Sequence, residues 1–344
     1  MPCFYPITAW HSRHVNPSGK RSLVFSSNKA QWADKPLEIA CGQCSGCRLE
    51  RSREWAVRCM HEADLHGLNN CFITLTFDEQ NLYKRPNPYT VDVRDFQLFM
   101  KRLRKKFGPN IRFYHCGEYG EVCRVSGKSR HNAPAGKFYP SIGRPHYHAL
   151  LFGFNFPDRE LFKISPQGNH LYTSNILAEL WPYGLAVIGD VSFQSAAYVA
   201  RYVMKKVNGS KADEVDRFGL RPYERMNLQT GEVFQCAPEY TTMSRRPGIG
   251  KDWYDKFKDD VFPHDYVVVN GVKCRPPKYY FSQLENDCPE MYDEIKLDRI
   301  RKMKKNELEG LLEHGNDYKI VKSKQLDDAR RNHDARMSLL TRKL

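Results

Sequence analysis

The chain has 344 residues, a formal net charge of +14 and a hydrophobic fraction of 41%. This length allows one large domain or two smaller ones, and the apolar fraction excludes a generally disordered chain. A cationic surplus of this size favours a polyanionic partner, because each neutralised phosphate releases condensed counterions. The sequence contains no run of about 18 apolar residues and no signal-peptide pattern, which predicts a cytoplasmic protein without a membrane partner.

Composition and turn signals divide the chain into three regions. We expect a Cys-rich N-terminal region at 1–65, packed on a main domain at 66–285, and a charged helical tail at 286–344. Residues 1–40 are polar and rich in turns, which predicts an irregular arm ahead of a helix at 48–65.

A cysteine cluster lies just before that helix. Cys41, Cys44 and Cys47 are each separated by two residues, and thiolates at this density suit a tetrahedral structural Zn²⁺. The best candidate for a fourth ligand is Cys3, with Cys59 and His61 as alternatives. A reduced cysteine-rich turn without metal stays open, because the paired second half of a full zinc finger is missing.

Strands and helices follow one another in the main domain. In chain order we expect a strand at 71–77, a helix at 90–107, a strand at 111–116, a basic loop at 121–144, a strand at 145–154, a helix near 175–181, a strand at 185–191 and a helix at 195–206. This order predicts an α+β fold with a central antiparallel β-sheet and helices packed on its face or faces. We expect strand 145–154 to be central and helix 195–206 to pack across the edge of the sheet.

Two histidines begin the strand at 145–154. Because side chains alternate along a strand, His146 and His148 point to one face and Tyr147 to the other. The two imidazoles are then about 6.5 Å apart by strand rise, close enough to bind one divalent metal ion. Two ordinary, partly solvated histidines are the alternative.

Tyr198 and Tyr202 are one helical turn apart in the segment 195–206, with Lys205 and Lys206 in the next turn. A tyrosine hydroxyl becomes a useful nucleophile when a cation polarises its target, whereas an aromatic stripe packed on a core is the common alternative. Phosphate contacts are expected from the basic residues Arg124, Lys128, Arg130, Lys137 and Arg144 of the loop and from Arg245 and Arg246.

Three motifs together resemble the HUH endonucleases, the family of rolling-circle replication initiators and relaxases. Strand 72–77 is similar to the first family motif, His146-Tyr147-His148 to the second, and Tyr198, Tyr202 and Lys205 to the two-tyrosine form of the third. The cysteine stretch at 41–48 and the segment 243–250, followed by Trp253, narrow the resemblance to replication initiators of gokushovirus-type microviruses. The resemblance covers residues 1–285 and is weak in the tail.

The resemblance implies a chemistry and a set of roles. His146 and His148 would bind Mg²⁺ or Mn²⁺ with Glu118, which closes the strand that begins at Ile111, as the candidate third ligand; a surface-turn carboxylate is the other interpretation of Glu118. The two tyrosines would be nucleophiles, and Lys205 or Lys206 would balance phosphate charge.

The implied reaction is nicking and rejoining of one strand of the origin DNA of a small circular single-stranded DNA phage, through a 5′-phosphotyrosine. The substrate would be single-stranded or nicked double-stranded DNA in the cytoplasm of the bacterial host. The sequence has no nucleotide-binding glycine loop, so a host helicase and polymerase are expected partners. Two other functions stay open: a nonenzymatic zinc-containing protein that binds single-stranded nucleic acid, and a hydrolytic metallonuclease without a covalent intermediate.

Overall fold

The computed structural model describes residues 3–120, 138–139, 143–201 and 212–339. The chain forms two compact units, one made of Met1–Arg51 with Asp293–Leu344 and the other of Ser52–Tyr292. Whether the boundaries predicted at 65 and 285 delimit separate domains stays a prediction. Among the described residues, no helix combines the length and apolarity needed to cross a bilayer.

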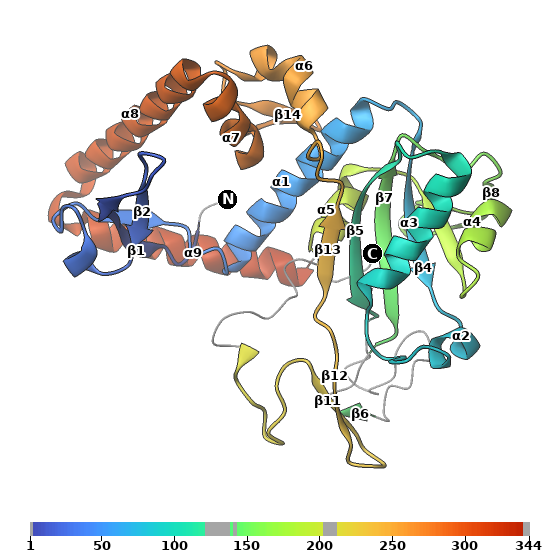
Figure 1. Cartoon of the computed structure of the whole chain (residues 1–344). Coiled ribbons are helices and arrows are strands. Elements are labelled where there is room, and N and C mark those ends of the chain that lie inside the picture. Colours follow the sequence, from blue (N-terminus) through green and yellow to red (C-terminus); the bar gives the residue numbers. More distant parts are fainter. Residues whose placement is uncertain (1–2, 121–137, 140–142, 202–211, 340–344) are drawn as a thin grey trace. The chain divides into compact units, whose positions relative to one another are not determined.

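The larger unit is built on a seven-stranded sheet in which every neighbouring pair is antiparallel (Figure 1). In spatial order the strands are β13 (Tyr240–Met243), β5 (Arg112–Tyr119), β7 (Pro145–Phe152), β4 (Asn70–Thr76), β10 (Ala186–Gly189), β9 (His170–Thr173) and β8 (Glu160–Ile164). The predicted antiparallel α+β fold is confirmed, and β7, which carries the histidine pair, lies inside the sheet between β5 and β4.

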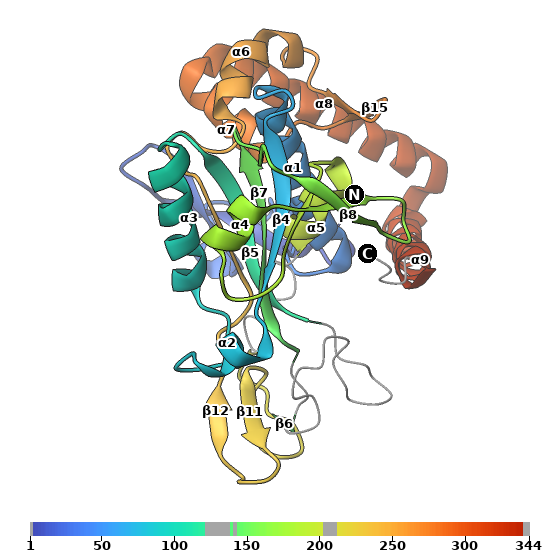
Figure 2. The same cartoon turned by 90° about the vertical axis from the view of Figure 1, so that its right-hand side faces the viewer.

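Helices cover both faces of this sheet (Figure 2). One face carries α3 (Val93–Phe107) and α4 (Asn175–Leu180), and the other carries α5 (Phe193–Arg201) and the part of α1 (Ser45–Asp64) that belongs to this unit. The predicted placement of the tyrosine helix across the sheet edge is wrong. Helix α5 packs over β7 and β5, because its apolar residues Ala196, Val199 and Ala200 are buried against the sheet interior.

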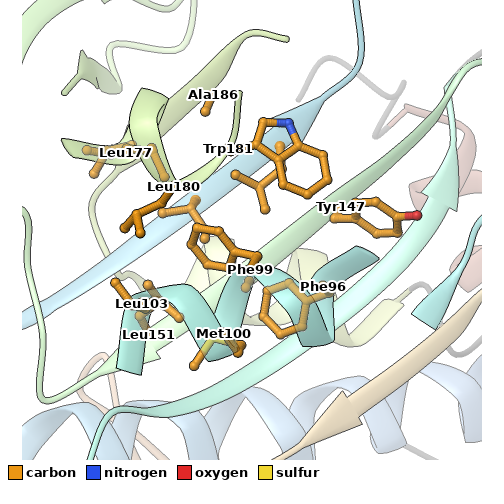
Figure 3. Packing of buried hydrophobic residues seen from close by; sticks show 14 of the residues in the cluster. Phe96, Phe99, Met100, Leu103, Tyr147, Leu151, Leu177, Leu180, Trp181 and Ala186 are labelled. Carbon is orange, nitrogen blue, oxygen red and sulfur yellow. The ribbon is translucent and has the colours of Figure 1, made fainter. Parts of the chain in front are cut away.

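The core under α3 follows directly from its periodicity. Phe96, Phe99, Met100 and Leu103 recur at three- and four-residue spacing and are buried against the sheet together with Trp181 (Figure 3). The side chain of Asp92 caps the helix start by accepting the Arg94 N–H, and Gly108 ends the helix with a φ of 100°. This face therefore provides a rigid support for β7.

The described residues of the larger unit also form two shorter sheets and three further helices. Strand β11 (Glu224–Asn227) lies between β12 (Val233–Gln235) and β6 (Phe138–Tyr139), and β14 (Val267–Val269) pairs with β15 (Val272–Cys274). The three-stranded sheet extends beyond the end of the main sheet at which β5 stops and β7 begins (Figures 1 and 2). The helices are α2 (Glu79–Tyr83), α6 (Lys251–Val261) and α7 (Lys278–Asp287).

The prediction of an irregular arm at residues 1–40 is wrong, because these residues form strands in the smaller unit. Its N-terminal part is a three-stranded sheet with β1 (Ile7–Val15) between β2 (Arg21–Val24) and β3 (Leu37–Ile39), followed in the chain by the start of α1. Most side chains of these strands are exposed, so the alternation that identifies a half-buried strand is absent. The helical tail is confirmed as α8 (Pro289–His314) and α9 (Tyr318–Leu339), joined by a short 3₁₀ turn at Gly315–Asp317. Another 3₁₀ turn, Ser27–Lys29, lies between β2 and β3.

We expect a pH-dependent stability from His61, a buried residue of α1. Its ring stacks on Trp253 with centroids 3.5 Å apart, and its Nδ1 is 2.9 Å from the Tyr280 hydroxyl. Burial lowers the pKa of His61 to about 3, so only the unfolded chain binds this proton between that value and about 6.5. The contribution of neutral His61 to the free energy of unfolding is therefore complete above about pH 6.5. It declines by about 1.4 kcal/mol per pH unit as the pH falls below that value.

Denaturant unfolding of His61→Phe between pH 7.5 and 4.5 measures this contribution. Below about pH 6.5 the unfolding free energy of the natural protein should fall more steeply than that of the variant. The exposed His170, replaced by Phe, serves as the control, and its curve should parallel that of the natural protein. Parallel curves for His61→Phe would contradict the assignment.

Candidate active site

The register of three strands places the predicted ligands on one face of the sheet. Glu118 on β5 lies directly opposite His146 on β7, and on the other side of β7 Thr74 of β4 lies opposite His148. Strand alternation directs all four side chains to the face covered by α5. The sheet register therefore brings together residues that the sequence separates by as many as 74 positions.

A single carboxylate oxygen lies between the two histidines. Glu118 Oε1 is 2.9 Å from His146 Nε2 and 2.9 Å from His148 Nε2. Glu118 is 1% exposed, and the three candidate ligand atoms all lie within 4.8 Å of one another. The donor set is thus two imidazole nitrogens and one carboxylate on a rigid sheet, a combination suited to a divalent metal ion.

The hydrogen bonds behind the histidines fit a cation at this point. His146 Nδ1 is 3.1 Å from the Arg144 carbonyl oxygen, which can only accept, so Nδ1 carries the proton. In the neutral ring, Nε2 then carries a lone pair that faces the Glu118 carboxylate. Because Nε2 and the carboxylate oxygen are both acceptors, this arrangement needs a proton or a metal ion between them. Thr74 Oγ1 lies 2.9 Å from His148 Nδ1 and orients the second ring in the same way.

The electrostatics keep Glu118 ionised. Burial by itself raises the pKa of this carboxyl group, but its hydrogen-bonding contacts with His146 and His148 hold that pKa well below its usual range. A carboxylate that remains charged at neutral pH can act as a metal ligand or accept a hydrogen bond throughout the physiological range.

Tyr198 reaches the same cluster from α5. Its hydroxyl donates to Glu118 Oε1 at 3.2 Å and lies 3.4 Å from His148 Nε2. Phe72 fixes the neighbouring rings, since it stacks on His148 at 5.5 Å and meets the Tyr198 ring edge-on at 6.4 Å. The site therefore combines a candidate nucleophile with the candidate metal ligands.

Tyr147, between the two histidines, points to the opposite face of the sheet, where it contacts the start of α3. Its hydroxyl donates to Asp95 Oδ2 at 2.6 Å and accepts the Asp92 N–H at 3.0 Å. Asp95 also pairs with Arg85 at 2.7 Å. These bonds link β7 to the start of α3, and they explain why a tyrosine fits the middle position of the motif.

The entry to β7 depends on a close backbone approach. A Cβ atom on Gly143 would lie 1.8 Å from the Gly120 carbonyl oxygen, so only glycine fits there. The Gly120 N–H donates to the carbonyl of Arg144 at 2.9 Å, and Arg144 Nη1 donates to the Phe77 carbonyl at 3.0 Å. Arg144 thus has a role in shaping the site edge in addition to its predicted phosphate contact.

Several predicted residues lie outside the described part of the chain. They are Tyr202, Lys205, Lys206, Arg124, Lys128, Arg130 and Lys137. Arg245 and Arg246 are exposed on the turn before α6, where a phosphate contact stays a prediction.

Buried and half-buried charged residues, which the sequence analysis did not identify, hold that turn in place. Glu62, 1% exposed, accepts the Gly250 N–H at 2.6 Å and pairs with Arg112. Arg58 donates to the Ile249 carbonyl at 3.0 Å and lies between the rings of Trp55 and Tyr279. The only sequence signal was Gly250, whose φ of 77° favours glycine.

The second predicted metal cluster lies in the smaller unit. The sulfur atoms of Cys3, Cys41, Cys44 and Cys47 all lie within 4.8 Å of one another. Of the alternative fourth ligands, Cys59 is buried in the sheet-facing core of α1 and His61 stacks on Trp253, so neither belongs to this cluster.

Comparisons with known proteins match the part of the sequence that carries this site. The family model described as replication-associated protein ORF2/G2P matches residues 70–131 and 138–207, a span that includes Glu118, the histidine pair and Tyr198. No solved structure matches the chain significantly.

Three curated phage proteins are similar over most of the chain. Replication-associated protein VP4 of Bdellovibrio phage phiMH2K is 30% identical over 312 residues, 90% of this chain and 84% of the relative. Replication-associated protein ORF2 of Spiroplasma virus 4 is 30% identical over 76% of this chain and 72% of its own length. Replication-associated protein ORF4 of Chlamydia phage 1 is 27% identical over 70% of this chain and 52% of its own length. The extent of these matches shows that the chain belongs to the family of phage replication-associated proteins and has a role in phage replication.

Proposed function

We propose that the chain nicks and rejoins one strand of phage origin DNA, with Tyr198 as the nucleophile of the first cleavage. The observation that carries this proposal is the position of the Tyr198 hydroxyl, 3.2 Å from Glu118 Oε1 and 3.4 Å from His148 Nε2. A tyrosine packed only for its apolar ring has no need of such polar neighbours. The net charge of +14 favours the polyanionic substrate.

His146, His148 and Glu118 would hold Mg²⁺ or Mn²⁺, since their ligand atoms meet within 4.8 Å. When bound there, the cation supplies Lewis-acid polarisation of a phosphoryl oxygen. The chain's own residues do the rest. The Arg144 carbonyl and Thr74 orient the imidazoles, and Glu118 holds the Tyr198 hydroxyl by its hydrogen bond.

The proposed step balances without an external reactant. Tyr198 Oη forms a bond to phosphorus, the bond from phosphorus to the 3′-oxygen breaks, and the proton lost by the tyrosine is matched by the one that the 3′-oxygen gains. The products are a 5′-phosphotyrosine and a free 3′-hydroxyl. Attack of a 3′-hydroxyl on the phosphotyrosine reverses the step and rejoins the strand.

Tyr202 would perform a second attack, and Lys205 or Lys206 would balance phosphate charge. We propose the cytoplasm of the bacterial host as the location, with single-stranded or nicked double-stranded origin DNA as substrate. Strand separation and synthesis would come from a host helicase and polymerase.

The test uses the purified full chain, Mn²⁺ and labelled single-stranded oligonucleotides tiled across the phage genome, separated on denaturing gels. We expect a protein–DNA adduct on one oligonucleotide that EDTA abolishes. Tyr198→Phe should lose the adduct at least about 10³-fold, because the phenyl ring keeps its packing and lacks the nucleophile. The matched control is Tyr172→Phe on β9, which should form the adduct at the natural level.

Any other result of this experiment would replace the proposed role of Tyr198 or the proposed function. An undiminished adduct in Tyr198→Phe that disappears in Tyr202→Phe would transfer the first attack to Tyr202. Cleavage without adduct would replace the proposal by a hydrolytic metallonuclease, and binding without cleavage on every oligonucleotide would replace it by a nonenzymatic nucleic-acid-binding protein.

A further inference from the structure

The cysteine cluster of the smaller unit has the geometry of a complete metal site. Cys44 Sγ and Cys3 Sγ are 4.0 Å apart, and all four sulfurs lie within 4.8 Å of one another. Zinc–sulfur bonds of about 2.3 Å place the corners of a tetrahedron about 3.8 Å apart. A disulfide needs sulfurs about 2.05 Å apart, and the four cysteines are free thiols.

Backbone N–H groups already point at these sulfurs. Cys3 Sγ accepts from Cys41 at 3.2 Å, Cys41 Sγ from Cys44 at 3.4 Å, and Cys44 Sγ from both Cys47 and Phe4 at 3.5 Å. Hydrogen bonds of this kind stabilise thiolates.

The described part of the smaller unit also lacks a sizeable apolar core. Among its described residues the buried hydrophobic side chains are Phe4, Ala9, Ala30 and Ile295. Burial on this scale cannot offset the entropy of ordering three strands and two long helices. Small units of this kind commonly depend on a metal ion or a disulfide.

The residues next to the cysteines receive the C-terminal helix α9. The ring of Phe4 lies 5.2 Å from that of His333, Tyr5 Oη accepts from Arg330 at 3.0 Å, and Ser45 Oγ donates to Asp334 at 3.4 Å. These surface contacts are individually weak. Phe4, Tyr5 and Ser45 each lie within two residues of Cys3 or Cys44, so a metal ion bound by these cysteines would hold them in place.

We propose that Cys3, Cys41, Cys44 and Cys47 bind one structural Zn²⁺, which ties the N-terminal strand region to the start of α1 and thereby maintains the surface on which α9 docks. This site is independent of the proposed nicking activity. Its four thiolates suit Zn²⁺, a borderline-soft cation, whereas the two imidazoles and one carboxylate of the sheet accept several divalent ions.

The first test is the metal content of the full chain purified under reducing conditions and dialysed. We expect one zinc per chain, retained in His146→Ala/His148→Ala and lost in Cys41→Ser and Cys44→Ser. The matched control Cys274→Ser, outside the cluster, should keep the zinc. Co²⁺ alone, added to the metal-free chain, should produce a thiolate-to-cobalt charge-transfer band that Zn²⁺ displaces.

The second test needs no variant and therefore does not depend on whether a cysteine variant folds. Removal of zinc by a chelator should raise amide hydrogen exchange in α9 at least about 10-fold and leave exchange in β4 and β7 unchanged, and added Zn²⁺ should restore protection. A zinc-free natural protein without a cobalt–thiolate band, zinc that is lost with the histidines, or cluster cysteines oxidised to disulfides would each overturn the proposal. Unchanged α9 exchange after zinc removal would overturn its docking role.

Discussion

Glu118→Gln is expected to lower the rate of protein–DNA adduct formation about 10³-fold, equivalent to about 4 kcal/mol of transition-state stabilisation. Glutamine keeps the shape of the side chain but removes the negative charge that lies 2.9 Å from both imidazoles. It also places an amide in a position where the two histidines and Tyr198 meet a carboxylate. Both the candidate metal site and the hydrogen bond to the nucleophile are weakened.

Three measurements distinguish this loss from a general defect. DNA affinity, measured by fluorescence anisotropy, should be unchanged or slightly higher, since the variant has one negative charge fewer. Raising the Mn²⁺ concentration should recover part of the rate, because the histidines remain. Glu179→Gln, a change at an exposed carboxylate of α4, is the matched control. A rate for Glu118→Gln within a few-fold of the natural protein would contradict the role given to Glu118.

Trp181→Ala should lower the free energy of unfolding of the larger unit by about 3–5 kcal/mol. The side chain is fully buried and packs against Phe99 and Tyr147 (Figure 3). It also contacts Phe77, and its indole N–H donates to the Thr76 carbonyl at 2.7 Å. The substitution leaves a cavity in the core and an unpaired carbonyl at the end of β4.

Urea denaturation followed by circular dichroism provides the measurement for Trp181→Ala. Leu68→Ala, at a site 94% exposed in the same unit, should change the unfolding free energy by less than about 0.5 kcal/mol. A loss below about 1 kcal/mol for Trp181→Ala would show that the sheet and α3 do not depend on this contact.

The sequence was most informative where structure is local. The alternation of a strand placed His146 and His148 on one face, and the three- and four-residue spacing of Phe96, Phe99 and Leu103 predicted α3 to within a few residues. It was least informative for β1 to β3, because strands exposed on both sides carry no hydrophobic alternation. The predicted packing of α5 across the sheet edge was wrong, because an apolar stripe on a helix does not specify which strands of a sheet it covers.

The sequence by itself determined the residue types and their local geometry: a histidine pair on one strand face, a tyrosine on an amphipathic helix, a cysteine knuckle and a strongly basic chain. Only the tertiary structure decided that Glu118 faces His146 across β5 and β7, that Thr74 orients His148, and that Cys3 completes the cysteine cluster. The physical reason is that pairing register and helix docking depend on contacts between residues far apart in the chain. Such contacts form only when the whole core is buried together, and no local pattern encodes them.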